Sequence, residues 1–208
     1  YSTTKQDSWY TAGDVVPDNK MSLTSWGQVR VLGYYSLLHY QNQLTPLAEK
    51  NIAQLKRQMI VFADSLMSEI NNNAYQTVMG KSLRDFTWGS NAVAANEGIA
   101  LIQAYLLTHQ KKYFNAAMTN LDYILGRNAT GYSFVTGYGS KTPMHPHHRP
   151  SVSDGIKDPV PGLLVGGPNP GHQDHCASYT THIPDESYTD DSCAYACNEI
   201  AINWNATI

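Results

Sequence analysis

The last stretch of the chain, residues 188–206, has the residue types that acid–base chemistry needs. It reads YTDDSCAYACNEIAINWNA, so Asp190, Asp191 and Glu199 stand among aromatic and small apolar residues. We expect a largely buried helix over residues 191–204. Because burial disfavours a charged carboxyl group, the pKa of Glu199 is predicted to be raised. A glutamic acid with a raised pKa is what a general acid requires, so this stretch predicts acid–base catalysis at Glu199.

A second group of chemically active residues is rich in histidine. Pro146-His147-His148-Arg149 precedes the glycine- and proline-rich loop 166–172, and the chain holds eight histidines in all. The run is compatible with a phosphate or metal site, with a polar surface, or with chance clustering of so many histidines. Zinc is disfavoured because the histidines and Cys176 lack a regular ligand spacing. We therefore predict no metal ligands here.

The three cysteines, Cys176, Cys193 and Cys197, cannot all pair within the chain. Cys193 and Cys197 fall on the same expected terminal helix. A role as small buried hydrophobic residues is therefore favoured over a metal or redox site. On that interpretation the cysteines do not indicate a cellular compartment.

Composition narrows the class of partner. The 208 residues carry a formal net charge of −3, only 15% of them are charged, and no basic run occurs. This balance argues against nucleic acid as a partner. No apolar stretch approaches the roughly 18 residues of a membrane span, which argues against a membrane. Fourteen tyrosines and four tryptophans stand against four phenylalanines, a bias toward rings with a polar group, such as those that stack on sugars.

Four further helices are expected to position these residues. Apolar and aromatic residues indicate helices over residues 22–40, 47–71, 91–108 and 111–125, and the second is the most regularly amphipathic. The last two are joined by few residues, which predicts an antiparallel hairpin. Residues 126–187 are dense in glycine, proline, histidine and serine without periodicity. A loop of that length inside a compact domain is usually functional.

Two motifs in the C-terminal part of the chain resemble the signatures of one enzyme family. The first is Gly139-Ser-Lys-Thr-Pro-Met-His-Pro-His-His-Arg149, and the second comprises Tyr188, Asp190, Tyr195, Glu199, Ala201, Asn205 and Ala206 at the family's spacing. Phe86-Thr-Trp-Gly-Ser-Asn91 and Leu121-Asp-Tyr-Ile-Leu-Gly126 resemble further family segments, so the likeness covers nearly the whole chain. The chain is similar to the glycoside hydrolases of family 9, chiefly cellulases.

This resemblance implies a fold, a reaction and a location. The fold is all-α, an (α/α)6 barrel, of which residues 1–208 would form the C-terminal portion of a single catalytic domain. The reaction is hydrolysis of β-1,4-glucosidic bonds in cellulose or related β-glucans with inversion at the anomeric carbon. No cofactor is required, and the family is secreted. Structural calcium is compatible with the resemblance, although no continuous ligand loop is visible in the sequence.

Residue roles also follow from the resemblance. Glu199 takes the general-acid position and Asp190 that of the invariant aspartate, so both are predicted to be catalytic. The residues expected to bind substrate are His147, Arg149, Trp204, Trp88 and Tyr195. One departure is Ser192-Cys193-Ala194, where many members carry an arginine and an aspartate, so the charge network around Glu199 would differ from theirs.

The catalytic base is the part of the chemistry without a match. Inversion needs two carboxyl groups about 6.5–9.5 Å apart, and the family's base lies in an Asp-Ala-Gly-Asp motif far upstream of the matched segments. Thr11-Ala-Gly-Asp14 imitates only half of that motif, and Asp14 is disfavoured as the base. We therefore expect two partners, a β-glucan and the N-terminal half of the same domain. The alternative is a non-catalytic carbohydrate-binding half-barrel, or an inactive fragment, that lacks the base.

Overall fold

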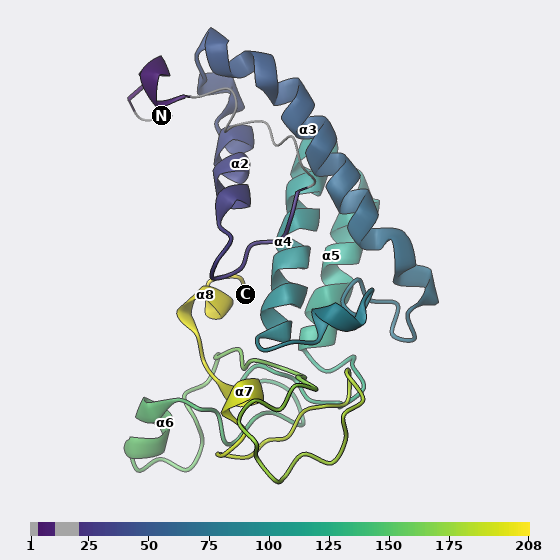
Figure 1. Cartoon of the computed structure of the whole chain (residues 1–208), viewed down its shortest axis with the longest axis vertical. Coiled ribbons are helices and arrows are strands. Elements are labelled where there is room, and N and C mark those ends of the chain that lie inside the picture. Colours follow the sequence, from purple (N-terminus) through teal and green to yellow (C-terminus); the bar gives the residue numbers. More distant parts are fainter. Residues whose placement is uncertain (1–3, 11–20) are drawn as a thin grey trace.

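The computed structural model describes residues 4–10 and 21–208, so Asp14 lies outside the described residues. This described part contains helices and no named strand, which confirms the predicted all-α class. The α-helices are α2 (Arg30–His39), α3 (Pro46–Leu66), α4 (Ser90–Thr108), α5 (Lys111–Ile124), α6 (Arg149–Ser153), α7 (Tyr195–Asn198) and α8 (Ile202–Asn205). The 3-10 turns are η1 (Asp7–Trp9), η2 (Gln41–Gln43), η3 (Met67–Asn72) and η4 (Leu83–Asp85). The long helices α3, α4 and α5 lie side by side, and most of the loops gather with α6 and α7 beneath them (Figure 1).

The helix α3 forms where the apolar periodicity is most regular. Pro46 occupies its first turn, where the missing N–H of proline costs no hydrogen bond. Its buried residues recur at intervals of three or four and form one face: Ala48, Ile52, Leu55, Met59, Ala63 and Leu66. The predicted helix over 47–71 is confirmed, with α3 ending at Leu66 and continuing as η3.

The helices α4 and α5 form the predicted antiparallel hairpin. The chain enters α4 from Gly89, whose φ of 83° is in the left-handed region, and leaves it at His109, with φ 56°. Inside the hairpin the Asn120 side-chain amide donates to the Glu97 carboxylate at 2.7 Å. Glu97 is almost completely buried, and this burial raises its pKa to about 8. The hairpin therefore holds a carboxyl group that titrates near neutral pH.

The helix expected over residues 22–40 is shorter than predicted. It begins only at Arg30, because residues 25–28 form a tight turn instead. In that turn Ser25 and Gln28 exchange two backbone hydrogen bonds, at 2.9 and 3.2 Å. Trp26, at the tip of this turn, is 89% exposed and has no packing that would favour a helix. The buried positions of α2 are Val31, Tyr34 and Leu38.

Apolar side chains form two clusters. The first lies mainly among the four helices α2, α3, α4 and α5. Its fully buried members include Leu55, Met59, Leu101 and Tyr113. The second joins the loop region to α4 and α5: it includes Phe134, Leu164, Val165, Ala194 and Cys197 together with Ala94, Ala95, Tyr123 and Ile124. The long loop over 126–187 is irregular as predicted, and α6 is its one helix. It is therefore a folded layer that packs on the α4–α5 hairpin.

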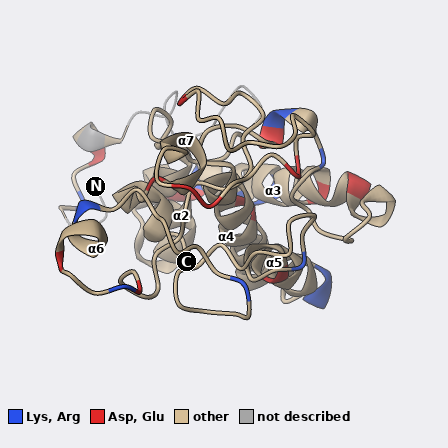
Figure 2. Cartoon of the chain, turned by 90° about the horizontal axis from the view of Figure 1, so that it is seen from below, with Lys and Arg blue, Asp and Glu red and all other residues tan. Residues whose placement is uncertain are grey.

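The surface carries few charges and many apolar groups. Seen from the end that carries α7, most of the ribbon is uncharged and the acidic and basic residues are scattered (Figure 2). Large apolar side chains are exposed on the long helices, for example Val61 of α3 (68%), Leu106 of α4 (55%) and Phe114 of α5 (41%). Within the described residues, no helix combines the length and apolar character needed to cross a bilayer.

Candidate active site

The predicted terminal helix over 191–204 is wrong, and the reason defines the site. Two short helices, α7 and α8, stand there, and the residues between them are extended: Glu199 has ψ 144° and Ala201 has ψ 140°. The last carbonyl groups of α7 accept hydrogen bonds from loops instead of from the next helical turn. The amide of Gly167 donates to the Cys197 carbonyl at 2.9 Å, and that of His147 to the Asn198 carbonyl at 2.8 Å.

This break changes the surroundings of Glu199. The residue pairs with His147 in a short parallel bridge, and its side chain is half-buried at the edge of the loop layer. The buried helical environment predicted for it is therefore wrong. Its Oε2 atom instead accepts a hydrogen bond from Nε1 of Trp88 at 2.9 Å. Trp88 lies just before α4, so residues 111 positions apart in sequence meet at one carboxylate.

Three rings lie in a row beside this carboxylate. The ring of Tyr195 is 5.7 Å from that of Trp88 and 5.8 Å from that of His147, measured between centroids. Trp88 is 39% exposed and Tyr195 37% exposed. Partly exposed rings with polar groups suit the faces and hydroxyl groups of sugars. The structure thus brings together four of the residues predicted from the sequence: Trp88, His147, Tyr195 and Glu199.

Arg149 lies at the far side of His147, on α6. A surface pocket of about 660 Å³ is lined by residues 144–149 and by part of the segment 151–159, with Ser192 at its edge. Both His147 and Arg149 are exposed. His148 and Ser151 line the same pocket, and Nδ1 of His148 lies 2.9 Å from Oγ of Ser151. The predicted substrate-binding pair therefore shares one pocket with His148, whose Nδ1 atom already has a partner within the chain.

Asp190 holds the histidine segment in place. Its side chain is only 9% exposed, and its two oxygens accept from the backbone amides of Met144 (2.8 Å) and His145 (2.9 Å). Both oxygens are thus used by the chain that leads into His147. This geometry favours a positioning role for Asp190, rather than direct contact with a substrate.

Trp204, also predicted to bind substrate, packs against the turn that precedes α4. Its ring packs against Gly89 and Gly166, where an added Cβ atom would come within 2.7 and 3.3 Å of it. The side chain belongs to the loop-region core. Close packing of this kind supports the turn that carries Trp88, since Gly89 follows it directly. The contacts of Trp204 therefore favour a role in packing next to the site.

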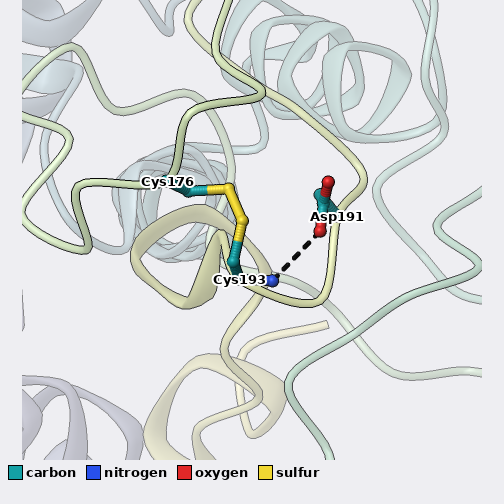
Figure 3. A group of neighbouring side chains, drawn as sticks. All are labelled: Cys176, Asp191 and Cys193. Atoms are coloured by element: carbon teal, nitrogen blue, oxygen red, sulfur yellow. Dashed lines mark hydrogen bonds between the residues drawn. A yellow bond between two sulfur atoms is a disulfide. The ribbon is translucent and has the colours of Figure 1, made fainter.

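The prediction for Cys193 is wrong. Cys193 is exposed and forms a disulfide with Cys176, as Figure 3 shows, whereas Cys197 is the buried free thiol. The error follows from the terminal helix, because only a continuous helix would have put Cys193 and Cys197 on one face. The amide of Cys193 also donates to Asp191 at 3.1 Å. Among the described residues, the one cluster with metal-ligand geometry comprises these two bonded cysteines and Asp191, and includes no histidine.

Two residues that sequence reasoning missed hold α7 in place. Asp174 accepts from the amide of Ala196 at 2.7 Å and from the hydroxyl of Tyr179 at 2.9 Å. Asn198 is fully buried and precedes Glu199. Asp174 reaches a backbone amide 22 positions away, and the Asn198 carbonyl accepts from the amide of His147, so no local pattern marks these partners.

Comparisons with known proteins identify the family of this chain. A family model described as Glycosyl hydrolase family 9 matches residues 1–208. The xyloglucan-specific endo-beta-1,4-glucanase BoGH9A of Bacteroides ovatus is 46% identical over 184 residues, which are 88% of this chain and 31% of that protein. A cellodextrinase of Butyrivibrio fibrisolvens is 35% identical over 195 residues, which are 91% of this chain and 34% of that one.

Solved structures give the same result for the fold. The structure of Bacteroides ovatus GH9 has a TM-score of 0.82 at 40% identity and covers 92% of this chain and 33% of its own. That of AaCel9A in complex with cellobiose-like isofagomine has a TM-score of 0.85 at 29% identity and covers 99% and 39%. These neighbours confirm the predicted (α/α)6 class, present here in part. The chain spans about a third of the length of the relatives that it matches.

Proposed function

The chain belongs to glycosyl hydrolase family 9, and on that premise we propose that the protein carrying it hydrolyses β-1,4-glucosidic bonds with inversion, using Glu199 as general acid. The single observation that carries this proposal is the meeting of Trp88 and Glu199 at 2.9 Å beside an exposed row of rings. A carboxyl group held next to sugar-binding rings can protonate the oxygen that leaves when the bond breaks.

The proposed substrate is a β-1,4-glucan. The named relatives include a xyloglucan-specific glucanase, a cellodextrinase and endoglucanase D of Acetivibrio thermocellus, so the shared feature of the class is the glucan backbone. Trp88 and Tyr195 would stack on glucosyl rings, while His147 and Arg149 would donate to hydroxyl groups. The hydrolysis needs no cofactor, and calcium would have only a structural role. The Cys176–Cys193 disulfide supports a secreted protein, because such bonds persist in oxidising surroundings.

The base that activates water is proposed to come from the rest of the catalytic domain. Both oxygens of Asp190 already accept backbone amides, so this residue is poorly placed to hold a water. Exposed apolar groups on α3, α4 and α5 suit burial by further helices of the same domain. The N-terminal half is therefore the proposed partner of this chain.

Glu199→Gln in the full-length protein tests the proposal. The amide keeps the shape of the side chain but cannot give a proton, so hydrolysis of unactivated glucan should fall by about 10²–10⁴-fold while binding stays nearly unchanged. A substrate with a strongly acidic leaving group should be affected much less. Equal losses on the two substrates would sink the assignment of the acid.

The second candidate is a carbohydrate-binding half-barrel without turnover. The row of rings favours it as much as it favours the enzyme. Residues 1–208 expressed alone, and then together with the upstream half, separate the two, with released sugar and its anomeric configuration as the measurement. We expect at most a trace of activity from the isolated chain and inverting hydrolysis from the pair. Binding without hydrolysis in the pair would favour the second candidate.

A further inference from the structure

Asn198 is a fully buried asparagine directly before Glu199. A buried amide is stable only when its donor and acceptor atoms have partners. Its Oδ1 atom accepts from the hydroxyl of Tyr188 at 2.7 Å, and its Nδ2 atom donates to the carbonyl of Thr189 at 2.6 Å. Its two shortest side-chain hydrogen bonds therefore go to the segment that precedes Asp190, and longer contacts of Nδ2 reach the Asp191 carbonyl (3.4 Å) and Sγ of Cys197 (3.6 Å).

The backbone of Asn198 links a different part of the chain. Its carbonyl accepts from the amide of His147 at 2.8 Å, so the first and second motifs meet at this residue. Asp190, next to Thr189, accepts the amides of Met144 and His145. The segment 144–147 is thus held at two points, by the carbonyl of Asn198 and by the side chain of Asp190. The side chain of Asn198 connects these two points through its bond to Thr189.

We propose that Asn198 is a positioning residue that sets the carboxyl group of Glu199 relative to His147 and Trp88. This inference rests on the proposed role of Glu199 as acid. The residue does not touch the substrate, since its side chain is buried and directed at Tyr188 and Thr189. It acts by ending α7 at the position where Glu199 must leave the helix and face the rings.

The physical reason is the competition for one carbonyl group. A continuing helix would use the Asn198 carbonyl for the amide of Ile202, four positions on. The amide of His147 takes it instead. The side chain of Asn198 makes this choice stable, because its bonds to Tyr188 and Thr189 hold the last turn of α7 against the rest of the loop layer. Loosening these bonds should let the Glu199 carboxyl group move away from Trp88.

Asn198→Asp in the full-length protein is the matched test. The new carboxyl group keeps an oxygen for Tyr188, but it places an oxygen where Nδ2 faced the Thr189 carbonyl. On unactivated glucan kcat should fall about 10- to 100-fold with little change in KM, because small displacements of a catalytic group cost that much. The loss should shrink on a substrate with an acidic leaving group. It should also shrink as the pH falls, since a protonated carboxyl group can again donate to Thr189.

The control is Asn128→Asp, which makes the same exchange at another buried asparagine. Asn128 donates to the carbonyls of Tyr123 (2.6 Å) and Tyr132 (2.9 Å) and accepts from Thr130, and none of these three is a site residue. It should lower thermal stability without the leaving-group or pH effects. If Asn198→Asp does not fold, Tyr188→Phe removes the hydrogen bond that Oδ1 of Asn198 accepts and should give a smaller loss of kcat with the same leaving-group dependence.

Two results would overturn the inference. The first is a loss of kcat in Asn198→Asp or Tyr188→Phe that is independent of the leaving group. The second is a rise in KM at unchanged kcat. A wrong assignment of Glu199 as the general acid would show separately, because Glu199→Gln would then retain activity on unactivated glucan.

Discussion

The indole of Trp88 donates its Nε1 hydrogen to Oε2 of Glu199 across 2.9 Å, joining the start of α4 to the break between α7 and α8. The bond orients a half-buried carboxyl group that the backbone alone would leave free to turn. It also keeps the aromatic face of Trp88 beside the ring of Tyr195. One contact thus couples the expected sugar platform to the expected acid.

Trp88→Phe should separate these two roles. Phenylalanine keeps an aromatic ring for stacking but has no hydrogen to donate to Glu199. We expect kcat to fall by about tenfold or more while KM changes little. The reason is that Glu199 becomes charged as it gives up its proton, and the variant lacks the hydrogen bond that stabilises this charge. Steady-state kinetics of the full-length protein on a soluble β-glucan check this. A raised KM at unchanged kcat would mean that Trp88 serves in binding alone.

His147→Ala and Arg149→Ala should each lower kcat more than they raise KM. Their hydroxyl contacts are expected to strengthen as the sugar ring distorts toward the transition state. His148→Ala is the matched control within the same pocket: Nδ1 of His148 lies 2.9 Å from Oγ of Ser151 and so has a partner within the chain, and we expect a smaller effect. Metal analysis of the purified protein adds a second measurement. Stoichiometric zinc that disappears in His147→Ala would turn this residue into a metal ligand.

Removing the Cys176–Cys193 disulfide should destabilise the loop layer. The bond joins residues 17 apart, and closing a loop of about that length is worth about 3 kcal/mol in the chain-entropy account. The double variant Cys176→Ser/Cys193→Ser should lose about 2–4 kcal/mol of unfolding free energy. Cys197→Ala, at the free thiol, leaves the bond in place. A reductant should lower the melting temperature of the parent and of Cys197→Ala, but not that of the double variant.

Glu97 should make stability depend on pH. Burial raises its pKa from 4.5 to about 8, so the folded state holds a proton that the unfolded chain releases between these values. The stability that this group contributes is therefore complete below about pH 4.5 and is lost as the pH rises toward 8, by at most about 1.4 kcal/mol per pH unit.

Glu97→Gln removes this titration and keeps an oxygen for the Asn120 amide. Melting temperatures between pH 5 and 8 should then fall less steeply than in the parent. The control is Asp85→Asn. It removes a neighbouring charge that also raises the Glu97 pKa, but it keeps the titrating carboxyl group of Glu97. Parallel curves for Glu97→Gln and the parent would contradict the prediction.

The sequence by itself determined the helices whose cause is local. The apolar positions of α3 recur every three or four residues, and the hairpin of α4 and α5 follows from two helical stretches with a short connection. The two motifs likewise named the residues of the candidate site, since a resemblance depends on residue type and spacing. Local periodicity and motif spacing are written in neighbouring positions, so they can be read without the fold.

Only the tertiary structure decided how residues 188–206 are arranged. Their local pattern is that of one helix, but the amides of His147 and Gly167 take the carbonyls of Asn198 and Cys197. With this arrangement Glu199 lies outside a helix, and Cys193 forms its disulfide with Cys176. These partners come from loops without periodicity, tens of residues away. A carbonyl group gains as much from a hydrogen bond to a distant amide as from one within a helix. The helix in the terminal segment therefore ends where the fold supplies an amide donor from another part of the chain.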